Sequence, residues 1–443
     1  MKKRGLWLLP FCLLLLCLLL TACSDSTDDT EPDGGNDAPS NSTQQQEKPS
    51  HLHSYTVNNV CEHCGAEYQD DGLEYLECSE GYAVIRYVGA SPTVNIPEKY
   101  QGRPVVRIDT GAFSYRNGIT SVWIPNSVTT IEESAFMGCV GLLEVTFSES
   151  LVSIGEKAFA GCTSLPKITL PGSLKTMGNN AFSQCAALTE LVLDDGLESI
   201  GKYAFRNCRK LQSVKLSNSM TEIPESAFEN CGHLKSMTIP SSVKTIGKLA
   251  FANCDDMTTL VMSEGVEKLE QYAFSYCSAL RDVTMPKTMK LIETYAFLNC
   301  ENIERVHITD ITAWCSIVFQ SNVSNPLYYA DGLCSDGEMM THITIPEECK
   351  EIKAFAFYNY DTLISLSLPD TLEKIGNYAF TSCNSLTSLY FGKGLKSVGV
   401  QALYDCKDLE KIYYSGTVNT WKNIEFKKGN EVSAKVQVVL QPR

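Results

Sequence analysis

The chain has 443 residues, of which 44% are hydrophobic, 20% charged and 9% aromatic. This apolar fraction excludes wholesale disorder, and 29 glycines and 17 prolines without a triplet period exclude a collagen-like chain. The net charge of −15 argues against a nucleic-acid partner, because phosphate contacts require clustered lysine and arginine side chains.

The N-terminus has the pattern of an export signal. A basic start precedes an apolar run over residues 6–20, which is short for a hydrocarbon core of about 30 Å. The following L-T-A-C, which ends at Cys23, resembles the lipobox of bacterial lipoproteins. The resemblance implies that residues 1–22 are a lipoprotein signal peptide and that lipidated Cys23 anchors an extracytoplasmic protein to the membrane. The alternative is an ordinary secreted protein with a chance cysteine at this position.

Residues 23–50 are predicted to form a disordered acidic tether. After Cys23 they contain no aromatic or β-branched aliphatic residue, and they carry seven acidic side chains against one lysine. Such a segment cannot bury enough apolar surface to offset the entropy lost on ordering.

A cysteine- and histidine-rich knuckle is predicted over residues 51–72. His51 and His53 precede Cys61 and Cys64, and the C-x-x-C-G turn lets two thiolates point at one tetrahedral ion. A closed four-ligand site would hold one structural zinc ion. A local disulfide and a pair of free thiols remain the alternatives.

A short motif recurs along most of the chain at a fixed spacing. It is an Ala-Phe pair, Ala-Leu in the last copy, and the copies are 23 residues apart except at one break. Self-similarity at about 20–29 residues is the mark of a leucine-rich solenoid. The second residues of the pairs are Phe113, Phe136, Phe159, Phe182, Phe205, Phe228, Phe251, Phe274, Phe297, Phe357, Phe380 and Leu403.

Each unit has the pattern expected of one coil of a β-solenoid. In the unit that starts at Cys162, apolar and polar residues alternate over residues 168–170 as in a strand, and Pro171 ends that strand because it lacks an N–H donor. A second apolar segment and the Ala-Phe pair then return the chain to the interior. One coil buries too little apolar surface to offset the ordering of its backbone, so coils must stack.

The combined pattern, C-x-x-L-x-x-[IV]-x-[LI]-P-x-x-[VL]-x-x-I-G-x-x-A-F, resembles the BspA-type leucine-rich repeats of bacterial surface proteins over residues 73–443. The resemblance implies a mainly β leucine-rich-repeat solenoid with irregular or short helical turns. The repeat count predicts about 13 coils. The resemblance also implies a binding module, since members of that family are surface or secreted proteins implicated in adhesion and protein recognition.

Two departures from the period divide the repeats. The motif W-x-x-I-x-F occurs inside an irregular insert and again near the C-terminus, where we expect it to cap the last coil. We expect the inner copy to bend the solenoid or to divide it into two arms. The predicted segments are an N-terminal β cap with the first coil (73–112), a repeat array (113–308), the insert (309–345) and a second array with its cap (346–443).

Cysteines recur at one position of the repeat. Stacked strands place successive Cα atoms about 4.8 Å apart with parallel side chains, whereas a disulfide needs Cβ atoms about 3.5–4.5 Å apart. We therefore expect structural thiols that fill a tight turn rather than disulfides. Cys78, Cys315, Cys334 and Cys349 lie outside this column, and the sequence does not pair them. The cysteine column is Cys139, Cys162, Cys185, Cys208, Cys231, Cys254, Cys277, Cys300, Cys383 and Cys406.

The polar position between the two strand apolars forms a second column, which we expect to line the concave face. Trp123 near one end, Tyr390 and Tyr413 at the other, and His307 between them are the candidate binding residues, because exposed aromatic side chains supply contact area at low entropic cost. The alternative is that these residues merely suit an exposed strand. The column is Trp123, Thr146, Thr169, Val192, Lys215, Thr238, Val261, Thr284, His307, Thr344, Ser367, Tyr390 and Tyr413.

These features predict a lipid-anchored surface protein that binds an extracellular protein or glycan. No G-x-S-x-G, H-E-x-x-H or phosphate-binding loop is present, so we expect no enzyme activity and no cofactor other than the zinc. A passive structural protein of the cell envelope is the alternative, followed by a surface hydrolase.

Overall fold

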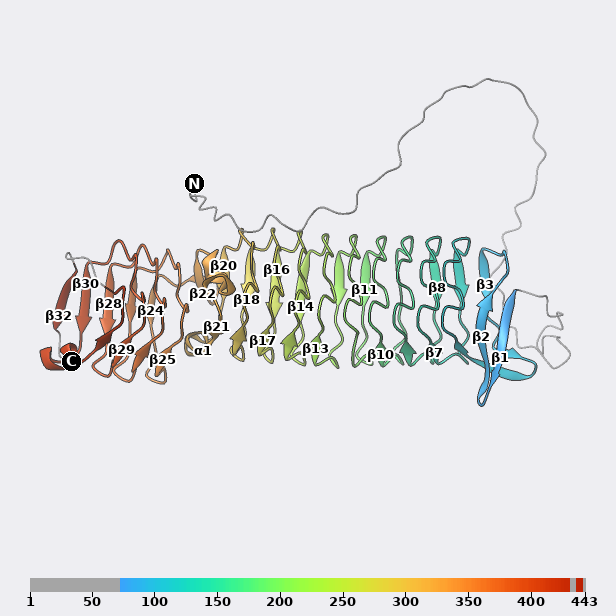
Figure 1. The fold of residues 1–443 in the computed structure, drawn as a ribbon. Coiled ribbons are helices and arrows are strands. Elements are labelled where there is room, and N and C mark those ends of the chain that lie inside the picture. The colour runs from blue at the N-terminus through green and yellow to red at the C-terminus, as the bar shows by residue number, and fades with distance from the viewer. Residues whose placement is uncertain (1–71, 431–435, 441–443) are drawn as a thin grey trace, which may run out of the picture. The chain divides into compact units, whose positions relative to one another are not determined.

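The structure is a computed structural model that describes residues 72–430 and 436–440. These residues form a mainly β solenoid of about 15 coils with repeats about 23 residues apart, which confirms the predicted fold class. The coils stack side by side in chain order (Figure 1). The count of about 13 was low because the N-terminal cap, the insert and the last segment also add strands to the stack.

One side of almost every coil carries a short parallel strand, and together these strands, which belong to four hydrogen-bonded sheets, make the first ladder. Its alternation follows the predicted pattern: in β14 the buried Met237 and Ile239 flank the exposed Thr238. The ladder comprises β3 (Thr93–Asn95), β6 (Ser121–Trp123), β8 (Glu144–Thr146), β11 (Glu190–Val192), β12 (Ser213–Lys215), β14 (Ser236–Ile239), β16 (Thr259–Met262), β18 (Asp282–Thr284), β20 (Arg305–His307), β22 (Gly332–Ser335), β24 (His342–Thr344), β26 (Ser365–Ser367), β28 (Ser388–Phe391), β30 (Lys411–Tyr414) and β32 (Gln437–Leu440).

A second ladder of mostly two-residue strands follows the second apolar segment of each coil. Its N-terminal edge is closed by the antiparallel pair β1–β2, and β4 (Lys99–Tyr100) folds back on β5. The second ladder comprises β1 (Leu73–Cys78), β2 (Gly81–Tyr87), β5 (Arg103–Ile108), β7 (Thr130–Ile131), β9 (Ser153–Ile154), β10 (Thr176–Met177), β13 (Glu222–Ile223), β15 (Thr245–Ile246), β17 (Lys268–Leu269), β19 (Leu291–Ile292), β21 (Val318–Phe319), β25 (Glu351–Ile352), β27 (Lys374–Ile375), β29 (Ser397–Val398) and β31 (Glu425–Phe426).

The Ala-Phe pairs form the third side of the coils and fill the interior. From Phe113 to Phe297 the rings stack in one row, with centroids of neighbouring rings 4.7–5.7 Å apart and planes within 11° of parallel. Backbone bonds join the coils here as well: the N–H of Phe136 donates to the carbonyl of Ala158 at 2.7 Å. The buried Ala-Phe pairs confirm the assigned repeat register.

Two residues in each regular coil adopt the left-handed conformation. One precedes the Ala-Phe pair and the other precedes the cysteine position, as Ser226 (φ 53°) and Asn230 (φ 62°) do in one coil. Glycine and asparagine are the residues that adopt this conformation at least cost, which explains Gly138, Gly161 and the asparagines of later coils just before their cysteines.

The strand predicted over residues 168–170 is wrong. The structure has only an isolated bridge between Lys167 and Glu190 in this coil, so β8 has no hydrogen-bonded neighbour on that side. The cause is Pro166: one coil later, the N–H of Thr189 donates to the Pro166 carbonyl at 3.1 Å, but Pro166 itself has no N–H for the equivalent bond to the coil before.

Both W-x-x-I-x-F segments fold into the same unit, here called the helix–strand unit. A short helix is followed by a strand of the second ladder: α1 (Ile311–Ser316) by β21, and α2 (Val418–Lys422) by β31. In each unit the tryptophan ring packs on the phenylalanine that ends the motif, with ring centroids 5.4 Å apart in the first and 5.5 Å in the second. Each unit then leads back to a strand of the first ladder, β22 or β32.

Both ladders are interrupted after the inner unit. On the first ladder β22 pairs with the antiparallel β23 (Glu338–Met339), and β24 begins a new sheet; on the second, β21 and β25 belong to different sheets. The intervening chain includes two single-turn helices, η1 (Asn322–Ser324) and η2 (Pro326–Tyr328).

We call this boundary, residues 311–360, the joint. It is held largely by side chains: Trp314 Nε1 donates to the Ala356 carbonyl at 2.8 Å, Asn325 Nδ2 to the Phe355 carbonyl at 2.7 Å, and the Tyr360 hydroxyl to the Met340 carbonyl at 2.6 Å. Packing specific to these residues therefore replaces strand pairing on both ladders at the joint.

Candidate functional site

The outward residues of the first ladder form a continuous row, here called the strand-face column. Strand pairing sets its register, since Trp123 pairs with Thr146, Thr284 with His307, and Ser367 with Tyr390. Column residues are half-buried or exposed, whereas the residues on either side of them along each strand are mostly buried. All thirteen predicted positions face outward, although Thr169 lies outside any strand.

Trp123 lies near the N-terminal end of the strand-face column. It is half-buried on β6, between the buried Val122 and Ile124, and its register partner toward the N-terminus is Asn95 on β3. The indole therefore stands on a rigid strand and is accessible to a ligand from the solvent side.

His307 belongs to a charged group in the middle of the chain. Its Nε2 lies 3.1 Å from Asp282 Oδ1, and Arg305 Nε lies 2.8 Å from the same oxygen. Burial raises the pKa of Asp282, but the hydrogen bonds from His307 and Arg305 together outweigh burial and leave the pKa below its usual range. His307 is thus already engaged within the protein, which weakens its case as a ligand contact.

Tyr390 and Tyr413 form the clearest feature of the strand-face column. They are register partners on β28 and β30, and their half-buried rings stack with centroids 4.5 Å apart and planes 10° from parallel. Ser367 and Val439 are the next residues of the row on either side. Each ring restricts its neighbour, so the pair presents two ring edges and two hydroxyls at little further entropic cost.

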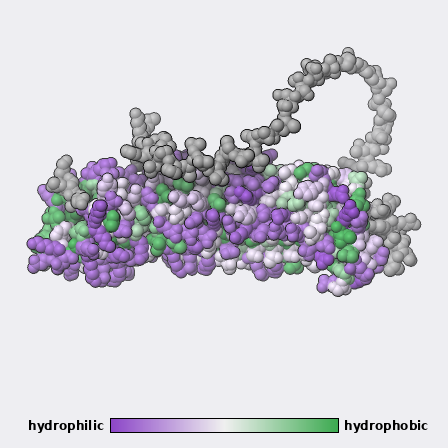
Figure 2. Space-filling view, in the orientation of Figure 1, coloured by the Kyte–Doolittle hydropathy of each residue, from purple (hydrophilic) through white to green (hydrophobic). Residues whose placement is uncertain are grey.

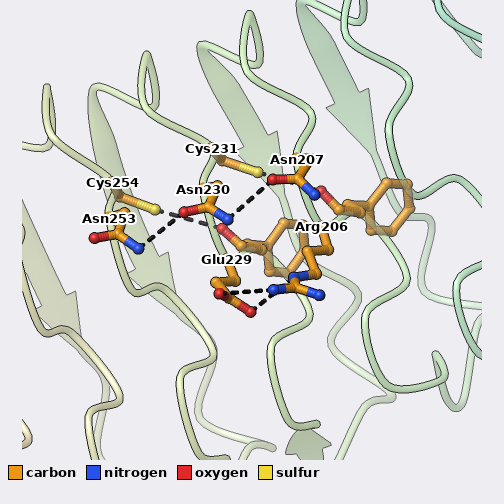
Figure 3. Close-up of polar contacts among 9 residues, drawn as sticks. Arg206, Asn207, Glu229, Asn230, Cys231, Asn253 and Cys254 are labelled. Atoms are coloured by element: carbon orange, nitrogen blue, oxygen red, sulfur yellow. Dashed lines mark hydrogen bonds and ion pairs between the residues drawn. The ribbon is translucent and has the colours of Figure 1, made fainter. Parts of the chain in front are cut away.

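The cysteine column is structural. Each thiol donates to the carbonyl of the phenylalanine that lies 26 residues earlier, as Cys231 does to Phe205 at 3.4 Å. Figure 3 shows Cys231 and Cys254 in this row. Burial raises the pKa of Cys231 to about 12, so the thiol keeps the proton that it donates.

Sequence reasoning missed one member of the cysteine column and the row of hydrogen-bonded asparagine side chains beside it. In the first coil after the joint the position is held by Tyr360. Next to the thiols, Asn253 donates to Asn230 at 2.8 Å and Asn230 to Asn207 at 2.9 Å, as Figure 3 shows. These amides belong to the left-handed position described above, and the pattern points to stability rather than ligand binding.

We expect the column thiols to be free in the mature protein. If protein denatured without reductant is treated with iodoacetamide, mass spectrometry should find most of the column positions alkylated, because parallel neighbours lie too far apart for unstrained disulfides. Every cysteine in the described ranges is unpaired in the structure. Quantitative pairing between adjacent column positions would contradict this geometry.

The structure also brings together a serine and a histidine that the sequence did not associate. His342 Nδ1 lies 2.7 Å from Ser365 Oγ, across the β24–β26 pair. Within the described residues no carboxylate bonds His342, and its side chain is exposed. The pair therefore lacks the group that orients a catalytic imidazole and the enclosed pocket that such chemistry uses.

A cavity of about 270 Å³ opens on the second ladder beside the joint. Its lining includes Lys353, Lys374, Lys427 and Glu351. Glu351 lies 2.5 Å from Lys353 and 2.7 Å from Lys374, so one carboxylate is shared by two of the three ammonium groups. The charged residues of the lining therefore leave the cavity with a net positive charge.

Several predicted sites lie outside the described residues: the lipidation residue Cys23 and the proposed zinc ligands His51, His53, Cys61 and Cys64. In residues 72–430 and 436–440, no three histidine, cysteine or acidic side chains are grouped so as to hold a metal ion. Over the same ranges, no helix is both long enough and apolar enough to span a bilayer. The surface seen in Figure 2 is mainly hydrophilic, with hydrophobic residues in small scattered groups.

Comparison with known proteins gives a family match over most of the chain. The sequence profile described as "BspA type Leucine rich repeat region (6 copies)" matches residues 106–235, 198–325 and 334–436. No curated protein matches the chain.

Three solved structures are similar to the chain to different degrees. A leucine-rich repeat protein from Bacteroides ovatus is 22% identical with a TM-score of 0.55, over 85% of this chain and 100% of that one. A leucine-rich cell surface protein from Faecalibacterium prausnitzii is 21% identical with a TM-score of 0.42, over 82% of this chain and 98% of that one. A leucine-rich repeat protein from T. pallidum is 28% identical with a TM-score of 0.40, over 48% and 89%.

Proposed function

Because this chain belongs to the BspA-type leucine-rich repeat family, we propose that it is a cell-surface recognition protein without enzyme activity. Membership of this family indicates a repeat-based binding or structural role. Beyond that, we propose that lipidated Cys23 anchors the chain outside the cytoplasm and that the strand-face column binds an extracellular protein or glycan. The observation that carries this proposal is the stacked pair Tyr390 and Tyr413 on the outward side of a rigid ladder.

The tyrosine pair is the proposed binding site because it offers more contact area than the rest of the strand-face column. Most of the other column positions hold small or aliphatic side chains such as Thr238 and Val261, whose contact area is limited. Tyrosine combines an apolar ring with a hydroxyl, and it is enriched among residues that dominate binding energy. Sugar rings and protein side chains can both pack on such a surface, so the proposal covers both ligand classes.

The double variant Tyr390→Ala/Tyr413→Ala should lose at least about tenfold in affinity, since removing a binding hot spot costs about 1.4 kcal/mol or more. Ligands would first be identified on arrays of mucin glycans and extracellular-matrix proteins, and affinity then measured by surface plasmon resonance. Folding should be unchanged by circular dichroism, because both rings lie on the outer side of the ladder.

The matched control is Tyr404→Ala. Tyr404 is 54% exposed and lies in the turn after an Ala-Leu pair, away from the strand-face column, so its removal should leave binding unchanged. Equal loss in the control and the double variant would contradict the assignment of the binding face. Failure of the wild type to retain any ligand on the arrays would favour the passive envelope role.

A further inference from the structure

The position directly after the second-ladder segment of each coil differs in charge between the two arrays. In the first array this position is acidic in three coils and basic in none. In the second array it is lysine in the first coil, glycine in the next two coils, and lysine again in the terminal helix–strand unit. The acidic residues are Glu132, Glu270 and Glu293, and the second-array residues are Lys353, Gly376, Gly399 and Lys427. The second array therefore has a gap two coils wide with a positive charge on each side.

The cavity of about 270 Å³ lies over this gap. Strand pairing runs in the order β25, β27, β29 and β31, so the two glycines lie between the two lysines, and all four residues line the cavity. Because neighbouring coils are about 4.8 Å apart, three steps separate the two lysine backbones by roughly 14 Å. The lining also includes Val318 on β21, a strand that does not pair with β25. The break in the second ladder and the missing side chains thus coincide at this hollow.

One carboxylate orients two of the lysine side chains. Glu351 is the register partner of Lys374 and accepts hydrogen bonds from both Lys353 and Lys374. Burial raises the pKa of Glu351, but these hydrogen bonds together outweigh burial and leave the pKa below its usual range. An ammonium group has three N–H donors, so each of the two lysines keeps two donors for a ligand. Among the described residues Lys427 has no ion-pair partner, so its charge is uncompensated.

Neutral groups of the lining also keep capacity for a ligand. Asn377 Oδ1 accepts a hydrogen bond from the N–H of Val400 at 2.9 Å, which fixes the amide and leaves its NH₂ group as a donor. In the part of the chain that the structure describes, the Ser397 hydroxyl is not hydrogen-bonded, and its register partner Glu425 does not line the cavity. Val318 adds an apolar side chain that is 45% exposed. The lining thus combines cations, neutral donors and apolar surface, as pockets for small ligands do.

We propose that this cavity is a second binding site, which holds one acidic sugar residue of an extracellular glycan with its carboxylate or sulfate group among the three lysines. The chain as a whole has a net charge of −15, so the attraction for an anion is local to the cavity. The volume lies just below the range of about 300–1,000 Å³ typical of pockets for drug-sized ligands, which suits one sugar ring and excludes a folded protein segment. The site goes beyond the proposed function because it lies on the second ladder and uses no residue of the strand-face column.

A sugar ring uses the whole lining. Its acidic group accepts hydrogen bonds from the ammonium groups, its hydroxyls accept from Asn377 and Ser397, and its C–H face packs on Val318. An aspartate or glutamate side chain presented by a protein would engage the lysines and leave the neutral donors unused. The chemistry of the lining therefore favours an acidic glycan over an acidic peptide.

The test is direct binding by the full chain, measured by isothermal titration calorimetry. The acidic probes are short oligosaccharides of hyaluronan, which carry carboxylate groups alone, and of keratan sulfate, which carry sulfate groups alone. Chitohexaose is the neutral probe, and polyglutamate is the acidic peptide. We expect at least one acidic oligosaccharide to bind, polyglutamate to bind more weakly, and chitohexaose not to bind. The acidic probe that binds identifies the acidic group.

Three variants locate the binding. Lys353→Gln/Lys427→Gln should weaken it at least about tenfold, because charge-assisted hydrogen bonds are lost. Lys202→Gln/Lys248→Gln removes the same charge from exposed positions in the first array and should leave the affinity unchanged. Ser397→Phe keeps every charge but fills the cavity with a ring, so it should abolish binding. Circular dichroism should show the native fold for all three, because these side chains lie on the outer side of the coils.

Failure of both acidic oligosaccharides to bind the wild type would overturn the proposal. Equal loss of affinity in the two lysine pairs, undiminished binding by natively folded Ser397→Phe, or tighter binding of polyglutamate would overturn it as well. Tyr390→Ala/Tyr413→Ala should leave this binding intact. Failure of the strand-face proposal and failure of this one are therefore seen separately.

Discussion

Replacing Phe205 by alanine should destabilise the solenoid by about 3–5 kcal/mol. The ring is fully buried and stacks between Phe182, at a centroid distance of 5.7 Å, and Phe228, at 5.4 Å. Its removal leaves a cavity that neighbouring coils cannot close, because backbone hydrogen bonds to both neighbours, such as that from the N–H of Phe205 to the Ala227 carbonyl at 2.8 Å, fix their separation. Urea unfolding followed by circular dichroism measures the change.

Tyr404→Ala, which removes an aromatic ring that is 54% exposed, provides the comparison and should change stability by less than about 0.5 kcal/mol. Hydrogen exchange should also rise in the coils next to Phe205 and stay unchanged in the second array, since each coil contacts only its neighbours. If Phe205→Ala unfolded at the same urea concentration as the wild type, the register of the whole array would be wrong.

Replacing Trp314 by alanine should cost a similar amount, about 3–5 kcal/mol, and should separate the two arrays in unfolding. The indole is 1% exposed, packs on Phe319, and donates to the Ala356 carbonyl across the joint. Alanine therefore removes core volume and leaves a buried carbonyl without one of its donors. Because no strand ladder crosses the joint, we expect two transitions in urea where the wild type has one.

Trp421 offers a matched control, because it holds the same place in the terminal unit but is only half-buried and packs on Phe391 and Tyr414 at the end of the described array. Trp421→Ala should cost less and should not divide the transition. A single, unshifted transition for Trp314→Ala would mean that the joint is held by other contacts than those described above.

The repeat made most of the fold predictable from the sequence. The 23-residue spacing of Ala-Phe pairs placed every phenylalanine of the row correctly, because a coil that cannot fold alone has to bury the same positions as its neighbours. The spacing also indicated that Cys231 and its equivalents are buried thiols. The carbonyls that these thiols bond could not be predicted, since they depend on the exact offset between adjacent coils.

Positions where one coil differs from the next were less predictable. Pro166 lacks one backbone N–H donor. Only the hydrogen-bond pattern of the neighbouring coils shows that the N–H at this position of the repeat starts a strand. The hydrogen bond from the N–H of Lys353 to the Cys315 carbonyl depends on how α1 packs against the following coil, which no period encodes. Trp123, Tyr390 and Tyr413 were placed on the correct face, but the stacking of the two tyrosines followed only from the structure.

The helix–strand unit lies beside the last described strand, β32, and also at the joint, so both arrays run up to the same local fold. A chain that stopped after the first array would have Trp314 in the place that Trp421 holds in the second. Genetic recombination at this point could therefore lengthen, shorten or swap the display surface in a single event, whereas a break inside a coil would leave an apolar face open to water.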